Sequence, residues 1–213
     1  MFPHIIPPLF LILKRHIINI NLIFKVKMHR NHMQGFKFEL VSKVKIQNMV
    51  TTADLKQVID IASFNEYEYL SSNLKLYRCG YVKDNKMVGR VTVFENGKLI
   101  SVGTKSPEQS IKELRKASRI LQKYNLSKST KIIPLVRNIV SRFDLQRKLD
   151  IEQLARTLPK SMYEPEMFPG LVYRIQDSCV ALLFSSGKGM IVGAKTIKEV
   201  NVAFYEINTK TKI

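Results

Sequence analysis

Side chains that could do acid–base or metal chemistry are scarce in most of this sequence. All four histidines lie within the first 32 residues. The two cysteines, Cys79 and Cys179, have no histidine or further cysteine near them in sequence, and we interpret both as packing residues. This distribution excludes most zinc sites, most general bases that titrate near neutral pH, and Ser-His or Cys-His nucleophiles. No P-loop, metal motif or carboxylate cluster stands out, so we expect a protein that is not an enzyme and needs no cofactor or metal.

The residues that point to binding recur at a spacing of 90. The segment Gln47-Asn48-Met49-Val50 recurs as Arg137-Asn138-Ile139-Val140. The segment 97–105, with Phe94 before it, recurs as 187–195, with Phe184 before it. A unit of this length is too long for a solenoid repeat. The sequence therefore predicts two pseudo-symmetric repeats, over 41–130 and 131–213, after an N-terminal arm over 1–40.

Each repeat is predicted to contain the same elements in the same order. The predicted strands cover 44–50, 90–94 and 98–102 in the first repeat, and 133–140, 180–184 and 188–192 in the second. A short helix follows the first strand, capped by Asp54 over 55–62 and by Asp150 over 151–158. A longer helix closes each repeat, beginning with the capping boxes at Ser106 and Thr196.

These strands carry apolar residues on both faces, although helices can cover only one of them. If the set that includes Val93 and Leu99 packs under the helices, the alternate set around Phe94 and Ile100 has nothing within the chain to pack on. The chain has 35 Lys and Arg against 17 Asp and Glu, a net charge of +18 and a pI near 10.0, which favours a polyanionic partner. A bare apolar sheet rimmed with lysine is typical of a surface that enters a duplex minor groove.

Several motifs in the sequence resemble those of a known family. The run Tyr163-Glu164-Pro165-Glu166-Met167-Phe168-Pro169-Gly170-Leu171-Val172-Tyr173-Arg174, with 182–188 and 192–195 after it, closely resembles the TATA-box-binding protein (TBP) family. The segment 46–50 is similar to the strand that opens that family's repeat, and the resemblance covers about residues 44–207. It implies an α+β saddle, in which two repeats form one curved antiparallel sheet with helices on the convex face.

The resemblance also implies a function and a set of contacts. It implies a general transcription initiation factor that binds the minor groove of AT-rich, TATA-like promoter DNA and bends it, a mode for which this family is itself the model case. Asn48 and Asn138 match central asparagines whose amides donate to the acceptors of A·T pairs. The apolar groove contacts and wedges that match are Val50, Phe94, Ile100, Val102, Val140, Phe168, Leu182, Phe184, Met190 and Val192. The phosphate contacts that match are Lys98, Arg174, Ser186 and Lys188.

Protein partners are implied at two places. Glu164, Glu166 and Met167 match the loop that touches transcription factor IIB. The basic face predicted for the helix after Ser106 is a candidate site for a IIA-type or other regulator. No membrane partner is expected, and the implied location is the nucleus, or a viral transcription compartment if a virus encodes the chain.

The sequence departs from the family pattern in the first repeat and at the centre. The second wedge of the first repeat falls at Leu74 when counted from the matched tyrosine, and at Ser72 when counted back from Tyr77-Arg78. Val102 and Val192 replace threonines, so two central hydroxyl donors are lost. These departures motivate an alternative function, a protein-interaction scaffold with little sequence-specific DNA binding.

The first 32 residues leave three interpretations open. They contain five basic residues and no acidic one, and an apolar stretch interrupted by prolines at 3, 7 and 8. The segment is a basic arm, an extension upstream of a true start at Met28 or Met33, or an interfacial anchor. It lacks the order of a signal peptide and is too short and too broken by proline to span a bilayer.

Overall fold

The computed structural model describes residues 44–128, 131–175 and 179–212. The predictions for the arm over 1–40 and for the start codon lie outside these ranges. The described residues belong to one compact unit that covers 39–213. No helix of the described part is long and apolar enough to cross a membrane.

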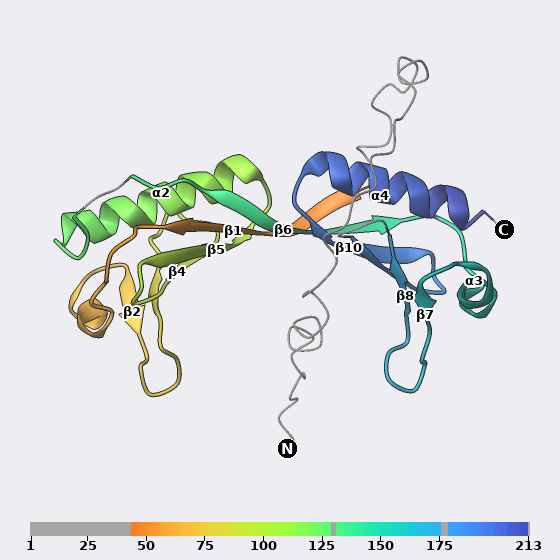
Figure 1. Cartoon of the computed structure of the whole chain (residues 1–213), viewed down its shortest axis with the longest axis horizontal. Helices are drawn as coiled ribbons and strands as arrows, with labels where there is room; N and C mark the ends of the chain where they lie inside the picture. The colour runs from red at the N-terminus through yellow and green to blue at the C-terminus, as the bar shows by residue number, and fades with distance from the viewer. Residues whose placement is uncertain (1–43, 129–130, 176–178, 213) are drawn as a thin grey trace, which may run out of the picture. The chain divides into compact units, whose positions relative to one another are not determined.

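Ten strands form one antiparallel sheet in the order β2-β3-β4-β5-β1-β6-β10-β9-β8-β7 (Figure 1). The strands of the first repeat are β1 (Val44–Asp54), β2 (Leu70–Ser72), β3 (Gly80–Val82), β4 (Arg90–Val93) and β5 (Lys98–Thr104). Those of the second repeat are β6 (Leu135–Asp144), β7 (Ser161–Met162), β8 (Leu171–Arg174), β9 (Val180–Leu183) and β10 (Lys188–Ala194). The two repeats join where β1 pairs with β6, so the sheet runs unbroken from one repeat to the other.

Two long helices lie along the same face of this sheet: α2 (Pro107–Lys123) in the first repeat and α4 (Ile197–Lys210) in the second (Figure 1). Each begins at its predicted cap. The Ser106 hydroxyl accepts from the backbone N–H of Gln109, and the Thr196 hydroxyl accepts from that of Glu199. The predicted α+β fold, with two repeats and one curved antiparallel sheet, is confirmed.

The prediction of an α-helix over 55–62 is wrong. The Asp54 carboxylate accepts from the N–H of Lys56, two residues on, which makes a turn and not a helix cap. The N–H groups of Leu55 and Ile59 then donate to carbonyls of the β4–β5 turn, so the segment is held against that turn. The 3-10 helix η3 (Ala62–Glu66) follows instead.

The matching prediction in the second repeat is confirmed. The Asp150 carboxylate accepts from the N–H of Gln153 at 2.9 Å and caps α3 (Ile151–Thr157). Asp60 lies 90 residues before Asp150, but its carboxylate accepts from Ala62 only two residues on. Asp60, and not Asp54, is therefore the repeat counterpart of the α3 cap.

The core lies between the helices and the sheet in two clusters, one in each repeat. Alternate strand residues such as Val93 and Leu99, or Leu183 and Ile191, are fully buried there. β1 and β6 also run four residues beyond their predicted ends. In the added part of β1, Thr51 is buried and its hydroxyl lies 2.7 Å from that of Ser110 on α2. This pairing satisfies polar groups that the sequence pattern does not link.

Candidate nucleic-acid interface

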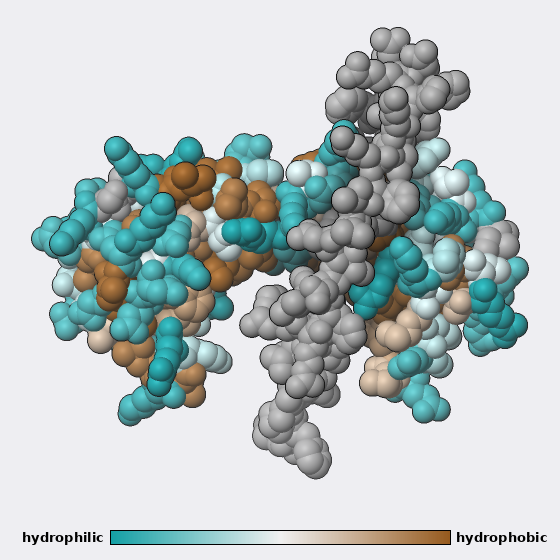
Figure 2. Space-filling view, viewed as in Figure 1, coloured by the Kyte–Doolittle hydropathy of each residue, from teal (hydrophilic) through white to brown (hydrophobic). Residues whose placement is uncertain are grey.

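The sheet face opposite α2 and α4, called the open face below, carries the predicted apolar contacts. Residues of this face alternate with the buried core residues along each strand, and each is half-buried in the chain by itself. They include Val50, Ile100 and Val102 in the first repeat, and Val140, Leu182, Met190 and Val192 in the second. Figure 2 shows hydrophobic residues that reach the surface of both repeats among hydrophilic side chains. The alternation leaves an apolar surface that no helix of the described residues covers.

Two asparagines lie at the junction of the repeats. The side-chain oxygen of Asn48 accepts from the backbone N–H of Gly103 at 2.8 Å, and that of Asn138 accepts from Gly193 at 2.8 Å. Both glycines have positive φ angles, 91° and 97°, a conformation that favours glycine. Because a backbone N–H can only donate, each amide must turn its oxygen to the glycine, which leaves its NH2 group as the available donor. The two donors are set in equivalent ways in the two repeats.

Two aromatic rings pack together in the second repeat. The Phe168 and Phe184 ring centroids lie 5.8 Å apart in an edge-to-face arrangement. Both rings lie against Gly170, where an added Cβ would come within 2.7 Å of the Phe168 ring and 3.0 Å of the Phe184 ring. The glycine therefore makes room for the ring pair.

The strand register identifies the counterpart of Phe168 in the first repeat. Gly80 on β3 pairs with Val93, and Leu171 on β8 pairs with Leu183. Val93 and Leu183 are repeat equivalents at the spacing of 90, so Gly80 corresponds to Leu171 and the spacing in this segment is 91.

The turn before these strands confirms the shifted spacing. The carbonyl of Asn73 accepts from the N–H of Tyr77 at 2.9 Å, just as that of Glu164 accepts from Phe168 at 2.9 Å. Tyr77 is therefore the counterpart of Phe168, and the placement of Leu74 or Ser72 there is wrong. Leu74 lies in this turn with 46% of its surface exposed. Sequence reasoning missed Tyr77 because it counted to the wedge from tyrosines, one of them Tyr77 itself, whose assumed matches the strand register does not support.

The predicted phosphate contacts are exposed at the strand ends. Lys98 and Lys188 begin β5 and β10, directly after the hairpin turns, and Arg174 ends β8. The backbone N–H of Lys98 donates to the Asn96 side chain at 3.2 Å. Exposed cationic side chains at these ends place positive charge at the border of the apolar face.

The loops after β2 and β7 project on the side opposite the helices (Figure 1). In the second loop Glu164 and Glu166 are exposed, and Met167 is 80% exposed. The shifted spacing makes Lys75 and Leu76 the counterparts of Glu166 and Met167. The acidic character is therefore confined to the loop of the second repeat.

The helix side of the sheet also carries exposed basic side chains. On α2 the outward side chains of Lys112, Arg115, Arg119 and Lys123 are exposed, as predicted. Lys116 forms a salt bridge with Asp84.

Burial and a hydrogen bond to Glu206 raise the pKa of Tyr173, whose hydroxyl lies 2.6 Å from Glu206. In the described ranges, no group of three or more His, Cys, Asp or Glu side chains could hold a metal ion.

The fold and this interface define a class of two-repeat α+β protein, in which helices cover one sheet face and an apolar face with paired central amides stays open. The model of the family described as "Transcription factor TFIID (or TATA-binding protein, TBP)" matches residues 43–124 and 133–211. The chain therefore belongs to the TATA-box-binding protein family.

Individual relatives agree with this assignment. The TATA-box-binding protein of Cenarchaeum symbiosum is 36% identical over 171 residues, which cover 79% of this chain and 94% of the relative. The TATA-box-binding protein-like 1 of Entamoeba histolytica is 32% identical over 170 residues, which cover 78% of each. Among solved structures, Methanococcus jannaschii TBP matches with a TM-score of 0.70 at 26% identity and covers 80% of this chain and 98% of its own.

Proposed function

We propose that this protein is a general transcription initiation factor that binds the minor groove of AT-rich, TATA-like promoter DNA through its open face and bends the duplex. Family membership and the names of its relatives support the promoter target. The open apolar face supports the groove, since a minor groove accepts apolar side chains along its floor.

The observation that carries the proposal is the pair of fixed amides, Asn48 and Asn138. Each has its oxygen held by a glycine N–H, so each presents a donor. At A·T and T·A pairs the minor groove offers only adenine N3 and thymine O2 acceptors, whereas guanine adds an N2 donor. Two donors at the centre therefore favour A·T pairs and disfavour G·C pairs.

The aromatic residues support bending. Phe168 and Phe184 form a preformed pair in the second repeat, and Tyr77 with Phe94 occupies the equivalent places in the first. Inserting such side chains between base steps costs a few kcal/mol per step, which the larger contact surface of the bent duplex offsets, as described for this family. We expect one kink at each end of the site.

The lysines supply attraction that does not depend on sequence. Lys98, Lys188 and Arg174 would each neutralise a phosphate near the border of the open face, with Ser186 as a neutral hydrogen-bond partner. Each phosphate neutralised contributes about −0.9 to the slope of log affinity against log salt. Binding should therefore weaken steeply as salt rises.

The acidic loop supports a protein partner. Glu164, Glu166 and the 80% exposed Met167 would bind a transcription factor IIB-type protein beside the bent DNA. The exposed basic face of α2 is suited to an acidic IIA-type or other regulator. We propose that the protein acts in the nucleus, like its eukaryotic relatives, as a binding protein and not as an enzyme.

The loss of hydroxyl donors at Val102 and Val192 favours a second candidate, a scaffold that binds protein partners with little DNA selectivity. One experiment separates the two. Dyes on the two ends of a short AT-rich duplex should approach each other on binding, and a GC-rich duplex of equal length should bind more weakly. Equal affinity for both duplexes without a change in dye distance would refute the DNA-bending proposal and favour the scaffold.

A further inference from the structure

Two β-bulges interrupt the β1–β6 ladder at the junction of the repeats. Along the β1–β6 ladder, Ile46 pairs with Ser141 and Asn48 with Val140, so Gln47 is an extra residue on β1. A second register shift, opposite Val50 and Thr51 of β1, makes Arg137 the extra residue on β6, between Val136 and Asn138. A bulge releases one residue from the ladder and turns its side chain away from the regular alternation. Gln47 and Arg137 are repeat counterparts, but one is neutral and the other cationic.

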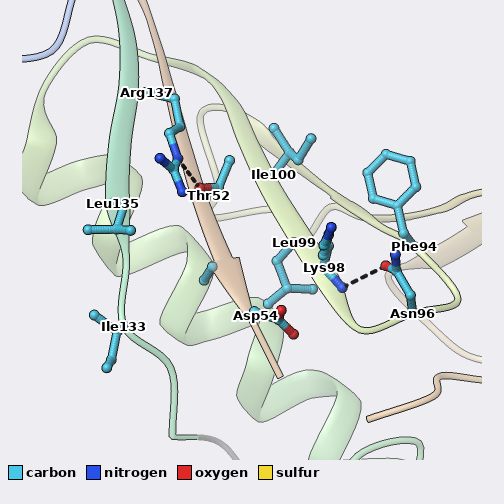
Figure 3. Close-up of a pocket in the computed structure, with 11 residues that line it drawn as sticks. Thr52, Asp54, Phe94, Asn96, Lys98, Leu99, Ile100, Ile133, Leu135 and Arg137 are labelled. Atoms are coloured by element: carbon cyan, nitrogen blue, oxygen red, sulfur yellow. Dashed lines mark hydrogen bonds between the residues drawn. The ribbon is translucent and has the colours of Figure 1, made fainter. Parts of the chain in front are cut away.

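The two bulged side chains make different contacts. The Gln47 amide donates to carbonyls of its own strand, at 3.3 Å to Lys45 and 3.4 Å to Ile46. Arg137 reaches across to β1, where its Nε donates to the hydroxyl of Thr52 at 2.9 Å (Figure 3). The Arg137 side chain is therefore held over the neighbouring strand, and that of Gln47 is not.

The contact places Arg137 on the open face. Thr52 pairs with Ile100, and paired residues of neighbouring strands point to the same side of a sheet. Arg137, Thr52, Ile100, Phe94 and Lys98 line one hollow of about 510 Å³ (Figure 3). This hollow adjoins the apolar contacts proposed for the groove and, at Lys98, the border proposed for phosphates.

The guanidinium of Arg137 has further N–H donors besides the one on Nε. Its Nε is occupied by Thr52, and within the described residues it forms no salt bridge, although Asp54 lines the same hollow. An arginine has five N–H donors in a planar fork, and its two terminal nitrogens match a phosphate in a bidentate way. The hydrogen bond from Nε to a neutral hydroxyl orients this fork without neutralising its charge.

We infer that Arg137 is a phosphate clamp at the centre of the interface, positioned by the Thr52 hydroxyl, and that it grips only one of the two DNA strands. This inference rests on the proposed DNA binding. The clamp is one-sided because the counterpart of Arg137 is Gln47, and the counterpart of Thr52 is Arg142, which has no acceptor to offer. A pseudo-symmetric protein thereby gains an unequal contact beside its two equivalent asparagines.

The test uses the purified full chain, an AT-rich duplex and a salt titration. Arg137→Gln gives β6 the residue that its counterpart bulge on β1 already carries, so the strand should still fold. We expect the log–log salt slope to fall in magnitude by about 0.9, which makes the variant's loss of affinity about eightfold larger after a tenfold reduction in salt. Lys198→Gln is the charge control: it removes one positive charge from an exposed position of α4, on the helix side of the sheet, and should leave the slope nearly unchanged.

Thr52 tests the positioning. Thr52→Val removes the hydroxyl but keeps the shape, so it should lower affinity several-fold with the salt slope retained, since the charge remains. Thr52→Ser restores the acceptor and should restore affinity. A purely structural role for Thr52 would instead lower thermal stability and affinity together in both variants.

The outcomes distinguish this inference from the proposed function. If the wild-type chain neither binds nor bends the duplex, the proposed function fails. If it does both, but Arg137→Gln leaves the salt slope unchanged, only the clamp is refuted. A loss confined to duplexes with one particular base pair would also refute the clamp, because it indicates base readout at Arg137.

Discussion

We predict that the two kinks proposed for the bound DNA form with unequal ease, because only the second repeat has a ring pair that is already packed. Gly170 lets the Phe168 and Phe184 rings pack edge to face. In the first repeat the shifted spacing places Cys79 at the position of Gly170, and its Cβ would occupy the space of a ring packed in this way. Tyr77 is accordingly 59% exposed. If these residues act as the proposed wedges, we predict that the second is preorganised and that the first is ordered only when DNA binds.

The change that tests this is Gly170→Ala. Its Cβ would lie 2.7 Å from the Phe168 ring, which must move. An edge-to-face aromatic pair contributes about 0.5–1.5 kcal/mol beyond the area that it buries. If this preorganisation is lost, affinity for the AT-rich duplex should fall about two- to twelve-fold. The distance between dyes at the duplex ends should also increase, because one kink is weakened.

Cys79→Ala is the matched control, since it changes the equivalent position, where the side chain contacts the Tyr81 hydroxyl. It should leave bending near the wild-type value, and thermal unfolding of both variants checks that the sheet is intact. The reasoning is refuted if Gly170→Ala binds and bends as the wild type does. It is also refuted if the two variants reduce bending equally.

Three further predictions concern single features. Asn138→Asp keeps the oxygen that accepts from the glycine N–H but replaces the outward donor, so affinity for the AT-rich duplex should fall at least about tenfold, while the melting temperature changes little. Val102→Thr combined with Val192→Thr adds hydroxyl donors to the open face and should sharpen selectivity for central A·T pairs about fivefold in a competition assay. Burial of Asp84 raises its pKa, but hydrogen bonds from Lys116 and from backbone N–H groups outweigh this and hold the pKa below its usual 3.8. A lowered pKa stabilises the fold above 3.8 and ceases to do so as the pH falls through the folded value. Asp84→Asn should therefore cost under about 1 kcal/mol of unfolding free energy at pH 7, and almost nothing well below pH 3.8, as measured by urea unfolding.

Local signals predicted most of the elements because they act over a few residues. The caps at Ser106, Asp150 and Thr196 lie three residues before the amide that each binds, so the sequence shows both partners together. The false cap at Asp54 has the same local appearance. It fails because the segment after it donates to the β4–β5 turn, about 40 residues away in sequence. Tertiary hydrogen bonds there outweigh the helical pattern.

The residues of the candidate interface also fall into two groups, those that local spacing predicts and those that require the folded structure. The spacing of 90 located the asparagines, Phe184 and the paired lysines, because each repeat carries them in the same strand. Tyr77 required the strand register, since a one-residue change in loop length leaves no mark on the alternation of a strand. Leu74 was placed by counting from a tyrosine whose assumed match the register does not support.

The sequence by itself determined the two-repeat organisation, the alternation that leaves one sheet face apolar, and the positive charge, because these depend only on residue type and spacing. The tertiary structure decided the orientation of those side chains and of their hydrogen-bonding groups. The glycines that turn the asparagine amides lie 55 residues from them, and the bulge that releases Arg137 toward Thr52 exists only where β1 and β6 pair. Hydrogen-bond direction and side-chain orientation depend on partners that the chain brings together only when it folds.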